Sequence, residues 1–224
     1  MNKFYQIHPA IQWLVALVLF LAGITIMVFW INLSNDSPAS HLLIFVFVPI
    51  WQFLFTPFFK LIGLYRYLSP MVLVFSPTNK KYDLHNGTSF DYLFSMQGIK
   101  PGIEWRKLML VYYLDALLEI VDSIEKGNLP DTVEVRGSSY FFSERTARKL
   151  GFEIDKTGVF EKINLLINYV DLLWMYSLAS GSLRWPDLRN IKTAKTTGRK
   201  LLQQKSGLLA LKAMYEVNLN TRNV

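Results

Sequence analysis

Residues 9–33, PAIQWLVALVLFLAGITIMVFWINL, decide the fold, because this long stretch contains no charged side chain. A helix needs about 20 apolar residues to cross the roughly 30 Å of hydrocarbon in a bilayer. A second uncharged stretch, residues 41–59, just reaches that length, although Pro49 and Pro57 each remove a helical hydrogen bond. The two stretches predict a transmembrane helical hairpin within residues 1–66. The alternative is a pair of buried core helices.

The charges that flank the two stretches predict their orientation. The loop between them contains Asp36 but no Lys or Arg, whereas Lys3 precedes the first stretch and Lys60 and Arg66 follow the second. Because cytoplasmic loops are enriched in Lys and Arg, we expect a multi-pass protein of the cell membrane with both termini in the cytoplasm. The first stretch is longer than a signal peptide and lacks a small-residue cleavage pattern, so we expect it to be retained.

The surplus of positive charge lies near the end of the chain. The net charge is +7, and residues 184–224 carry nine of the 24 Lys and Arg but only two of the 17 Asp and Glu. Cations beside a membrane bind anionic headgroups at about 1 kcal/mol each. We therefore expect residues 184–224 to form a basic helical tail that contacts membrane lipids through Lys192, Lys195, Arg199 and Lys200. The alternative is a solvated basic helix. Nucleic acid is not an expected partner, because no nucleic-acid motif is present.

Residues 67–183 predict a cytoplasmic α+β domain dominated by helices. Apolar residues recur at helical spacing over residues 104–126, and Gly127 follows as a stop signal. A second long helix is expected over residues 159–180, ended by Gly181. Short strands are expected at residues 82–85, 132–136 and 152–156. Residues 67–77 are either the first strand of the domain or an interfacial segment. The predicted fold class is a membrane-anchored α+β protein with a few short strands.

The stretch HNGTSFDY, residues 85–92, has two interpretations. As an active site, it would use His85 as general base, Ser89 or Thr88 as nucleophile and Asp91 as the orienting carboxylate. As a structural element, Gly87 would allow a turn with positive φ, Thr88 would cap a helix, and Asp91 would complete a capping box. The structural interpretation accounts for every residue of the stretch except His85, so both remain open.

A similar polar pattern recurs in VRGSSYFFSERTARKLGF, residues 135–152. Arg136, Ser138, Arg145 and Arg148 could together bind a phosphate or carboxylate group of a substrate. The alternative is that Gly137 ends a strand and that the serines satisfy loop backbone groups. The chain has no Cys, no His-rich cluster and no P-loop or dinucleotide motif, so neither a metal nor a cofactor is expected.

The expected helix over residues 159–180 combines a polar stripe with a broad apolar surface. Glu161, Asn164, Asn168 and Asp171 fall on one stripe, which would ordinarily face water. Apolar residues cover most of the remaining circumference, more than one small core can bury. We therefore expect an interface with other membrane proteins, with a second copy of the chain or with the membrane. The expected interface residues are Leu165, Tyr169, Leu172, Trp174 and Tyr176.

Two functions follow from these features. The favoured one is a non-catalytic subunit that assembles or regulates a membrane protein complex through its cytoplasmic domain. Its support is the excess apolar surface and the lack of a strong catalytic motif. The alternative is a membrane-bound enzyme that acts on a lipid-linked or anionic substrate, and its support is the polar stretch that begins at His85 and the nearby arginines.

Overall fold

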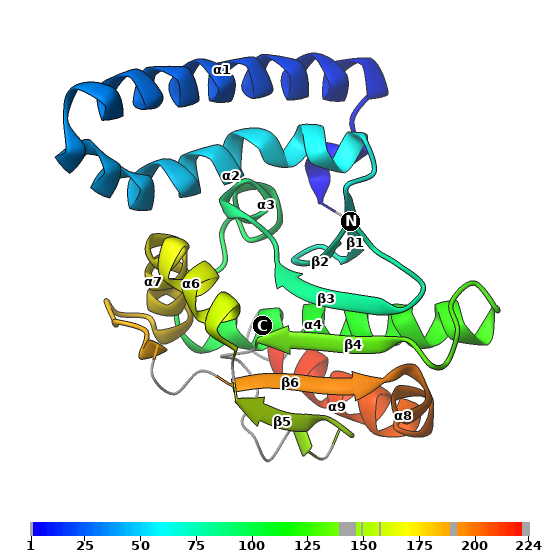
Figure 1. Cartoon of the computed structure of the whole chain (residues 1–224). Helices are drawn as coiled ribbons and strands as arrows, with labels where there is room; N and C mark the ends of the chain where they lie inside the picture. The colour runs from blue at the N-terminus through cyan, green and yellow to red at the C-terminus, as the bar shows by residue number, and fades with distance from the viewer. Residues whose placement is uncertain (1, 139–146, 149, 157, 189–191, 221–224) are drawn as a thin grey trace.

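The computed structural model describes residues 2–138, 147–148, 150–156, 158–188 and 192–220. It is an α+β protein in which an N-terminal helical hairpin lies beside a mixed β-sheet with helices packed on one face (Figure 1). The helices are η1 (Lys3–Gln6), α1 (Pro9–Asp36), η2 (Pro38–Leu43), α2 (Ile44–Leu61), α3 (Ser89–Ser95), α4 (Ile103–Glu125), α6 (Val159–Ile167), α7 (Tyr169–Ser180), α8 (Gly198–Gln203) and α9 (Lys205–Asn220). The strands are β1 (Tyr65–Ser69), β2 (Val72–Phe75), β3 (Lys81–Asn86), β4 (Glu134–Ser138), β5 (Glu153–Lys156) and β6 (Lys192–Thr197).

The expected N-terminal hairpin is present as α1 and α2, joined through η2. Gly23 of α1 lies directly against the ring of Phe55, and Phe20 stacks on Phe58 with ring centroids 4.2 Å apart. By length and composition, both helices are apolar enough to cross a membrane, and only 11% of the most apolar window of each is buried. A core helix of a soluble protein would be mostly buried, so this exposure favours the membrane interpretation over a pair of core helices.

The sheet has six strands in the order β1-β2-β3-β4-β6-β5. The neighbours β3 and β4 run parallel and are connected through α3 and α4, whereas the other neighbouring strands are antiparallel. Alternation sorts the side chains onto two faces. Tyr82 and Leu84 of β3 and Val135 of β4 point toward α4, whose Met109, Leu114, Leu117 and Ile120 complete the main core. The predicted strands at residues 82–85, 132–136 and 152–156 and the predicted helix at residues 104–126 are confirmed with small shifts.

The second face of the sheet carries polar residues and is covered only in part, by the helices α6 and α7. The single helix predicted over residues 159–180 is interrupted at Asn168. Helix α7 is held against the start of α4, because the backbone N–H of Gly102 donates to the carbonyl of Leu178 over 2.7 Å. It ends at Gly181, whose φ of +73° suits glycine and whose backbone touches that of Gly102.

The last part of the chain differs from the basic helical tail that we expected. Residues 192–197 form β6, which pairs with β4 on one side and β5 on the other. Thr193 and Thr196 of this strand are buried, and Leu201 and Leu208 of the following helices are fully buried against the core. We predicted this segment from its charge and overlooked two features: the alternation of residues 192–197 and the apolar residues Leu201 and Leu208.

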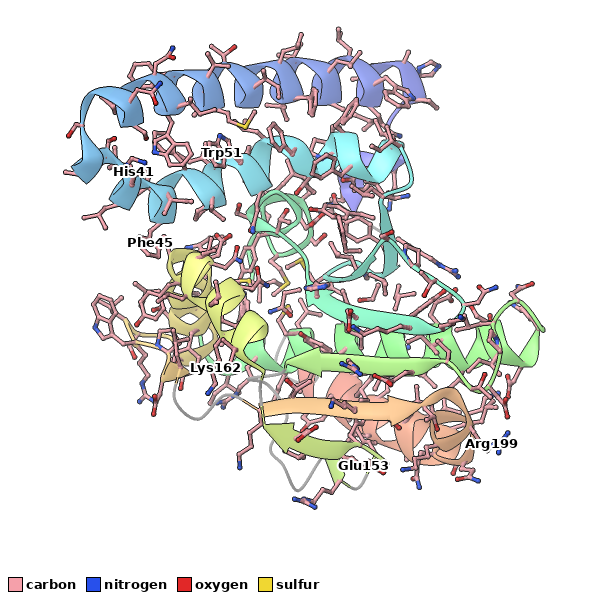
Figure 2. The ribbon with its side chains drawn as sticks, viewed as in Figure 1. His41, Phe45, Trp51, Glu153, Lys162 and Arg199 are labelled. Atoms are coloured by element: carbon pink, nitrogen blue, oxygen red, sulfur yellow. The ribbon has the colours of Figure 1, made fainter. Side chains whose placement is uncertain are left out.

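Three of the four basic residues expected at the membrane surface make ion pairs within the domain. Lys195 binds Asp155 at 2.6 Å and Arg199 binds Asp131 at 2.9 Å, while Lys200 binds Glu153 at 2.5 Å. Figure 2 shows Arg199 and Glu153 on the side of the domain that is remote from the hairpin. Lys192 belongs to the same strand as Lys195. Nothing in this arrangement favours the lipid contact that we expected of these four residues.

Two adjacent leucines of α9 test whether this segment is part of the core. We expect Leu208→Ala to lower the free energy of unfolding by about 2–5 kcal/mol, because the side chain is fully buried. Leu209→Ala should change it by less than about 0.5 kcal/mol, because the neighbouring side chain is 48% exposed. Denaturant unfolding of the detergent-solubilised protein measures both. Equal small effects would mean that the segment is a detachable tail.

Candidate functional site

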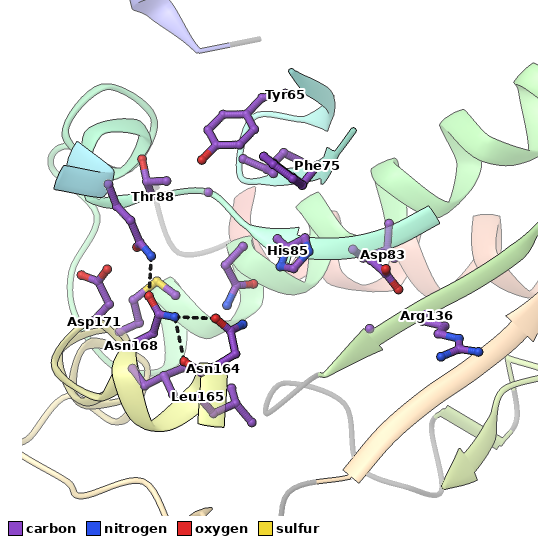
Figure 3. Close-up of a pocket in the computed structure, with 18 of the residues that line it drawn as sticks. Tyr65, Phe75, Asp83, His85, Thr88, Arg136, Asn164, Leu165, Asn168 and Asp171 are labelled. Carbon is purple, nitrogen blue, oxygen red and sulfur yellow. Dashed lines mark hydrogen bonds between the residues drawn. The ribbon is translucent and has the colours of Figure 1, made fainter. Parts of the chain in front are cut away.

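A pocket of about 550 Å³ lies between the polar face of the sheet, α2 and the helices α6 and α7 (Figure 3). Strands β2, β3 and β4 form its floor through Phe75, His85 and Arg136. Helix α2 contributes Gln52 to one wall. The turn between β3 and α3, residues 86–89, forms part of the rim. The pocket therefore draws on segments that are distant in sequence.

Asn164, Asn168 and Asp171 of the polar stripe line this pocket, whereas we expected the stripe to face water. The side chain of Glu161 lies outside the described part of the structure. Asn168 lies between α6 and α7 and connects these two helices to α2. Its Nδ2 donates to the backbone carbonyl of Asn164 over 2.7 Å and to the Asn164 side-chain oxygen over 3.0 Å, and its Oδ1 accepts from Nε2 of Gln52. Figure 3 shows Asn164 and Asn168 side by side, with these hydrogen bonds drawn as dashed lines. The hydrogen bonds fix the position of α6 and α7 relative to α2.

Asp171 of α7 is the carboxylate on this wall of the pocket. It is half-buried, and among the described residues it has neither a hydrogen bond nor an ion pair. Desolvation by burial raises the pKa of Asp171 to about 6. The carboxyl group has no partner among the described residues, so its oxygens are able to accept hydrogen bonds from a ligand.

His85 points into the pocket from β3 (Figure 3). Part of the ring is open to solvent, but the surrounding walls desolvate it, and this lowers the pKa of His85 from its usual value despite the opposing charge of Asp83. The lowered pKa favours the neutral imidazole, in which one nitrogen is able to donate a hydrogen bond and the other is able to accept one. Thr88 and Ser89 line the pocket beside it.

Asp91, the third residue of the catalytic hypothesis, is fully buried and does not line the pocket. It forms a capping box at the start of α3, because its Oδ2 accepts from the backbone N–H of Thr88 over 2.8 Å. Its Oδ1 accepts from Nδ2 of Asn2 over 3.0 Å and from the hydroxyl of Tyr67 over 2.7 Å. The structure thus brings His85 and Ser89 to the pocket and assigns Asp91 to the structural interpretation.

Gly87 is required for a different reason from the one expected. It does not have a positive φ. A Cβ at this position would instead lie 3.0 Å from Cβ of Asp91 and 3.2 Å from its Oδ2. The capping carboxylate therefore packs directly on the α carbon of the turn, and any side chain there would displace it.

The arginines expected to bind an anionic substrate do not assemble a site among the described residues. Arg136 lines the pocket but pairs with Glu134 on the same strand. Ser138 ends β4 opposite Thr193, Arg148 does not line the pocket, and Arg145 lies outside the described residues. Within the described ranges, no group of three His, Cys, Asp or Glu side chains could hold a metal ion.

The five residues expected at an interface lie in different surroundings. Leu165 and Leu172 line the pocket. Trp174 packs on Tyr92 with ring centroids 4.6 Å apart, and Tyr169 stacks on Trp185 with centroids 6.3 Å apart. Tyr176 lies in the middle of α7.

Sequence reasoning missed the contribution of the hairpin to the site. Gln52 is the one amide in the 18 residues of α2, and polar residues within a membrane helix are rare and usually face protein or a cavity. A lone amide in an apolar helix was therefore the signal in the sequence that α2 faces protein or a cavity at Gln52. The pairing of Gln52 with Asn168, 116 residues away, could not be inferred from a single sequence.

The buried carboxylate of Asp91 predicts a pH dependence of stability. Desolvation raises the pKa of Asp91 to about 6, although its hydrogen-bond donors oppose the shift. In the unfolded chain the carboxyl ionises near pH 4. Between about pH 4 and pH 6 the unfolded state binds fewer protons, so stability falls as the pH rises.

We therefore expect the unfolding free energy of the wild type, relative to Asp91→Asn, to fall by about 2–3 kcal/mol between pH 4 and pH 6. Denaturant titrations over this range measure the difference. Asp122→Asn, at an exposed position of α4, is the control and should show no such fall. A flat difference for Asp91→Asn would contradict the buried capping role.

No family model, no curated protein and no solved structure matches the chain.

Proposed function

We propose that this chain is a membrane-anchored protein that binds the polar headgroup of a membrane amphiphile in the pocket. The observation that carries the proposal is the place of Gln52. It lies on α2, a helix apolar and long enough to cross a membrane, and it also forms a wall of the pocket. A ligand that enters the pocket is therefore adjacent to the helix that anchors the protein, where an amphiphile can present its headgroup.

The lining of the pocket favours an uncharged headgroup rich in hydroxyl or amide groups. Side-chain amides both donate and accept hydrogen bonds, as neighbouring hydroxyls do, and Gln52, Asn86, Asn164 and Asn168 supply four of them. The basic residues offer little to an anion, because Lys81 pairs with Asp83 at 2.6 Å and Arg136 pairs with Glu134. Tyr65 and Phe75 add apolar ring surface against which a sugar ring could pack.

We propose a multi-pass topology in the cell membrane, with both termini in the cytoplasm. The N-terminal segment supports placing the chain start and the domain on the same side. Phe4 and Tyr5 are buried beside Phe90, and Asn2 binds Asp91. The cytoplasmic assignment itself rests on the Lys and Arg that flank the hairpin.

A second candidate is an enzyme that acts on the same lipid-linked ligand. It keeps His85 as general base and Ser89 as nucleophile, because both line the pocket, and it replaces Asp91 by Asp171 as the carboxylate of the site. The neutral imidazole, favoured by the lowered pKa of His85, suits a base. In this case His85→Ala abolishes turnover and leaves ligand retention intact.

A third candidate is the non-catalytic subunit of a membrane complex. The exposed apolar side chains of α6 and α7, among them Leu166 and Val170, favour it. A stoichiometric protein that remains bound after purification in mild detergent, and that is lost on Leu166→Lys, supports this function.

Ligand retention tests the pocket. We expect wild-type protein in nanodiscs that contain monoglucosyl diacylglycerol to keep this lipid in native mass spectrometry, and to lose diacylglycerol, which lacks the headgroup. Asp171→Asn keeps the side-chain volume but removes the charge. It should weaken retention by about tenfold or more, because hydrogen bonds to a charged group contribute about 1.5–3 kcal/mol. Asp122→Asn is the matched control outside the pocket. Equal retention of both lipids would overturn the proposal.

A further inference from the structure

The helices α6 and α7 turn polar side chains toward the protein and apolar side chains toward the surface, which is the reverse of surface helices in a soluble domain. Their polar residues Asn164, Asn168 and Asp171 line the pocket. On the surface, an apolar stripe follows the spacing i, i+3, i+7, i+11 and remains open to solvent. It consists of Ile163 (49% exposed), Leu166 (48%), Val170 (40%) and Trp174 (41%). A helix that faced water would show the opposite arrangement.

The position of these helices beside α2 indicates what covers the apolar stripe. Asn168 meets α2 at Gln52, midway along its 18 residues, rather than at its end. Between Ile44 and Trp51, α2 extends about 12 Å beyond this contact. Adding the part of η2 from Ala39 extends this to about 22 Å, still short of the roughly 30 Å of hydrocarbon. A hairpin that crosses the bilayer must therefore bring α6 and α7 into it.

We propose that α6 and α7 form a membrane-embedded segment whose stripe Ile163, Leu166, Val170 and Trp174 contacts lipid acyl chains. This part of the domain then lies within one leaflet of the bilayer, and the domain is not wholly in the aqueous phase. Figure 1 shows α6 and α7 close to α2, on the side of the domain where the hairpin turns. Figure 2 shows Phe45 of the hairpin above this helix pair.

The loop after α7 has the composition of a membrane–water boundary. Trp185 is 67% exposed and stacks on Tyr169 of α7, and the exposed Arg184 precedes it. Tryptophan is enriched at the headgroup level of membranes, and arginine can extend from there toward water. Lys162, also exposed, provides a second cation on α6.

The absence of cysteine from the chain gives a clean test by single-cysteine spin labelling. Nitroxide labels are placed at Leu166 and Val170 of the full-length protein in vesicles of phosphatidylethanolamine and phosphatidylglycerol. Leu21 on α1, which is exposed and within a candidate span, is the lipid reference. Leu209 on α9 is the water reference, because its 48% exposure equals that of Leu166. Collision rates with oxygen, which concentrates in lipid, and with a water-soluble nickel chelate are measured by electron paramagnetic resonance.

We expect the labels at Leu166 and Val170 to collide preferentially with oxygen, as the label at Leu21 does, and to be shifted away from the behaviour of the label at Leu209. Preferential collision with the nickel chelate would overturn the proposal. Low collision rates with both reagents would also overturn it, because they would mean that protein covers the stripe. All four labels occupy exposed positions, so the fold is preserved. The result does not depend on whether the pocket binds a ligand.

Discussion

The buried carboxylate of Asp91 connects the hairpin to the domain, and the site depends on that connection. It accepts hydrogen bonds from the N-terminal segment at Asn2, from β1 at Tyr67 and from the first turn of α3 at Thr88. Thr56 of α2 donates to the hydroxyl of Thr88 over 2.8 Å and brings the hairpin into the same group of contacts. A charge without solvent is costly unless several donors surround it. The donors to Asp91 come from the N-terminal segment, β1 and the N-cap of α3, and the contact of Thr56 with Thr88 fixes α2 where it can form a wall of the pocket.

Local features of the chain predicted much of the secondary structure. Long uncharged stretches gave α1 and α2, helical spacing gave α4, and alternation gave β3 and β4. The capping box at Thr88 was also readable, since it depends on residues three positions apart. β6 was not predicted, because its alternation is carried by threonines and an alanine among lysines, and its burial comes from strands far away in sequence. Net charge described the composition of this segment correctly but not its place in the fold.

The pocket shows where inference from one sequence ends. The residue types were visible: one amide in an apolar helix and a polar stripe on another. Whether these residues form a site depends on which way they face in the fold, and the sequence does not give that direction. A polar stripe faces water in a soluble domain, but here the amides of Gln52, Asn164 and Asn168 form hydrogen bonds with one another and line the pocket between the helices. Adjacency of His85, Ser89 and Asp91 in the sequence was a poor guide, because a helix start turns successive side chains to different sides.

The strand order has a consequence for how the protein is made. Among the described strands, β5 pairs only with β6, and β6 lies between β5 and β4, so residues 192–197 join two strands that precede them in the sequence. The hairpin, by contrast, precedes every strand of the sheet in the sequence. Domains tend to form in the order of synthesis. The hairpin is therefore synthesised while the sheet still lacks β6 and while the edges of β4 and β5 that pair with it are unpaired. Translation of residues 192–197 is the event that allows the sheet to close.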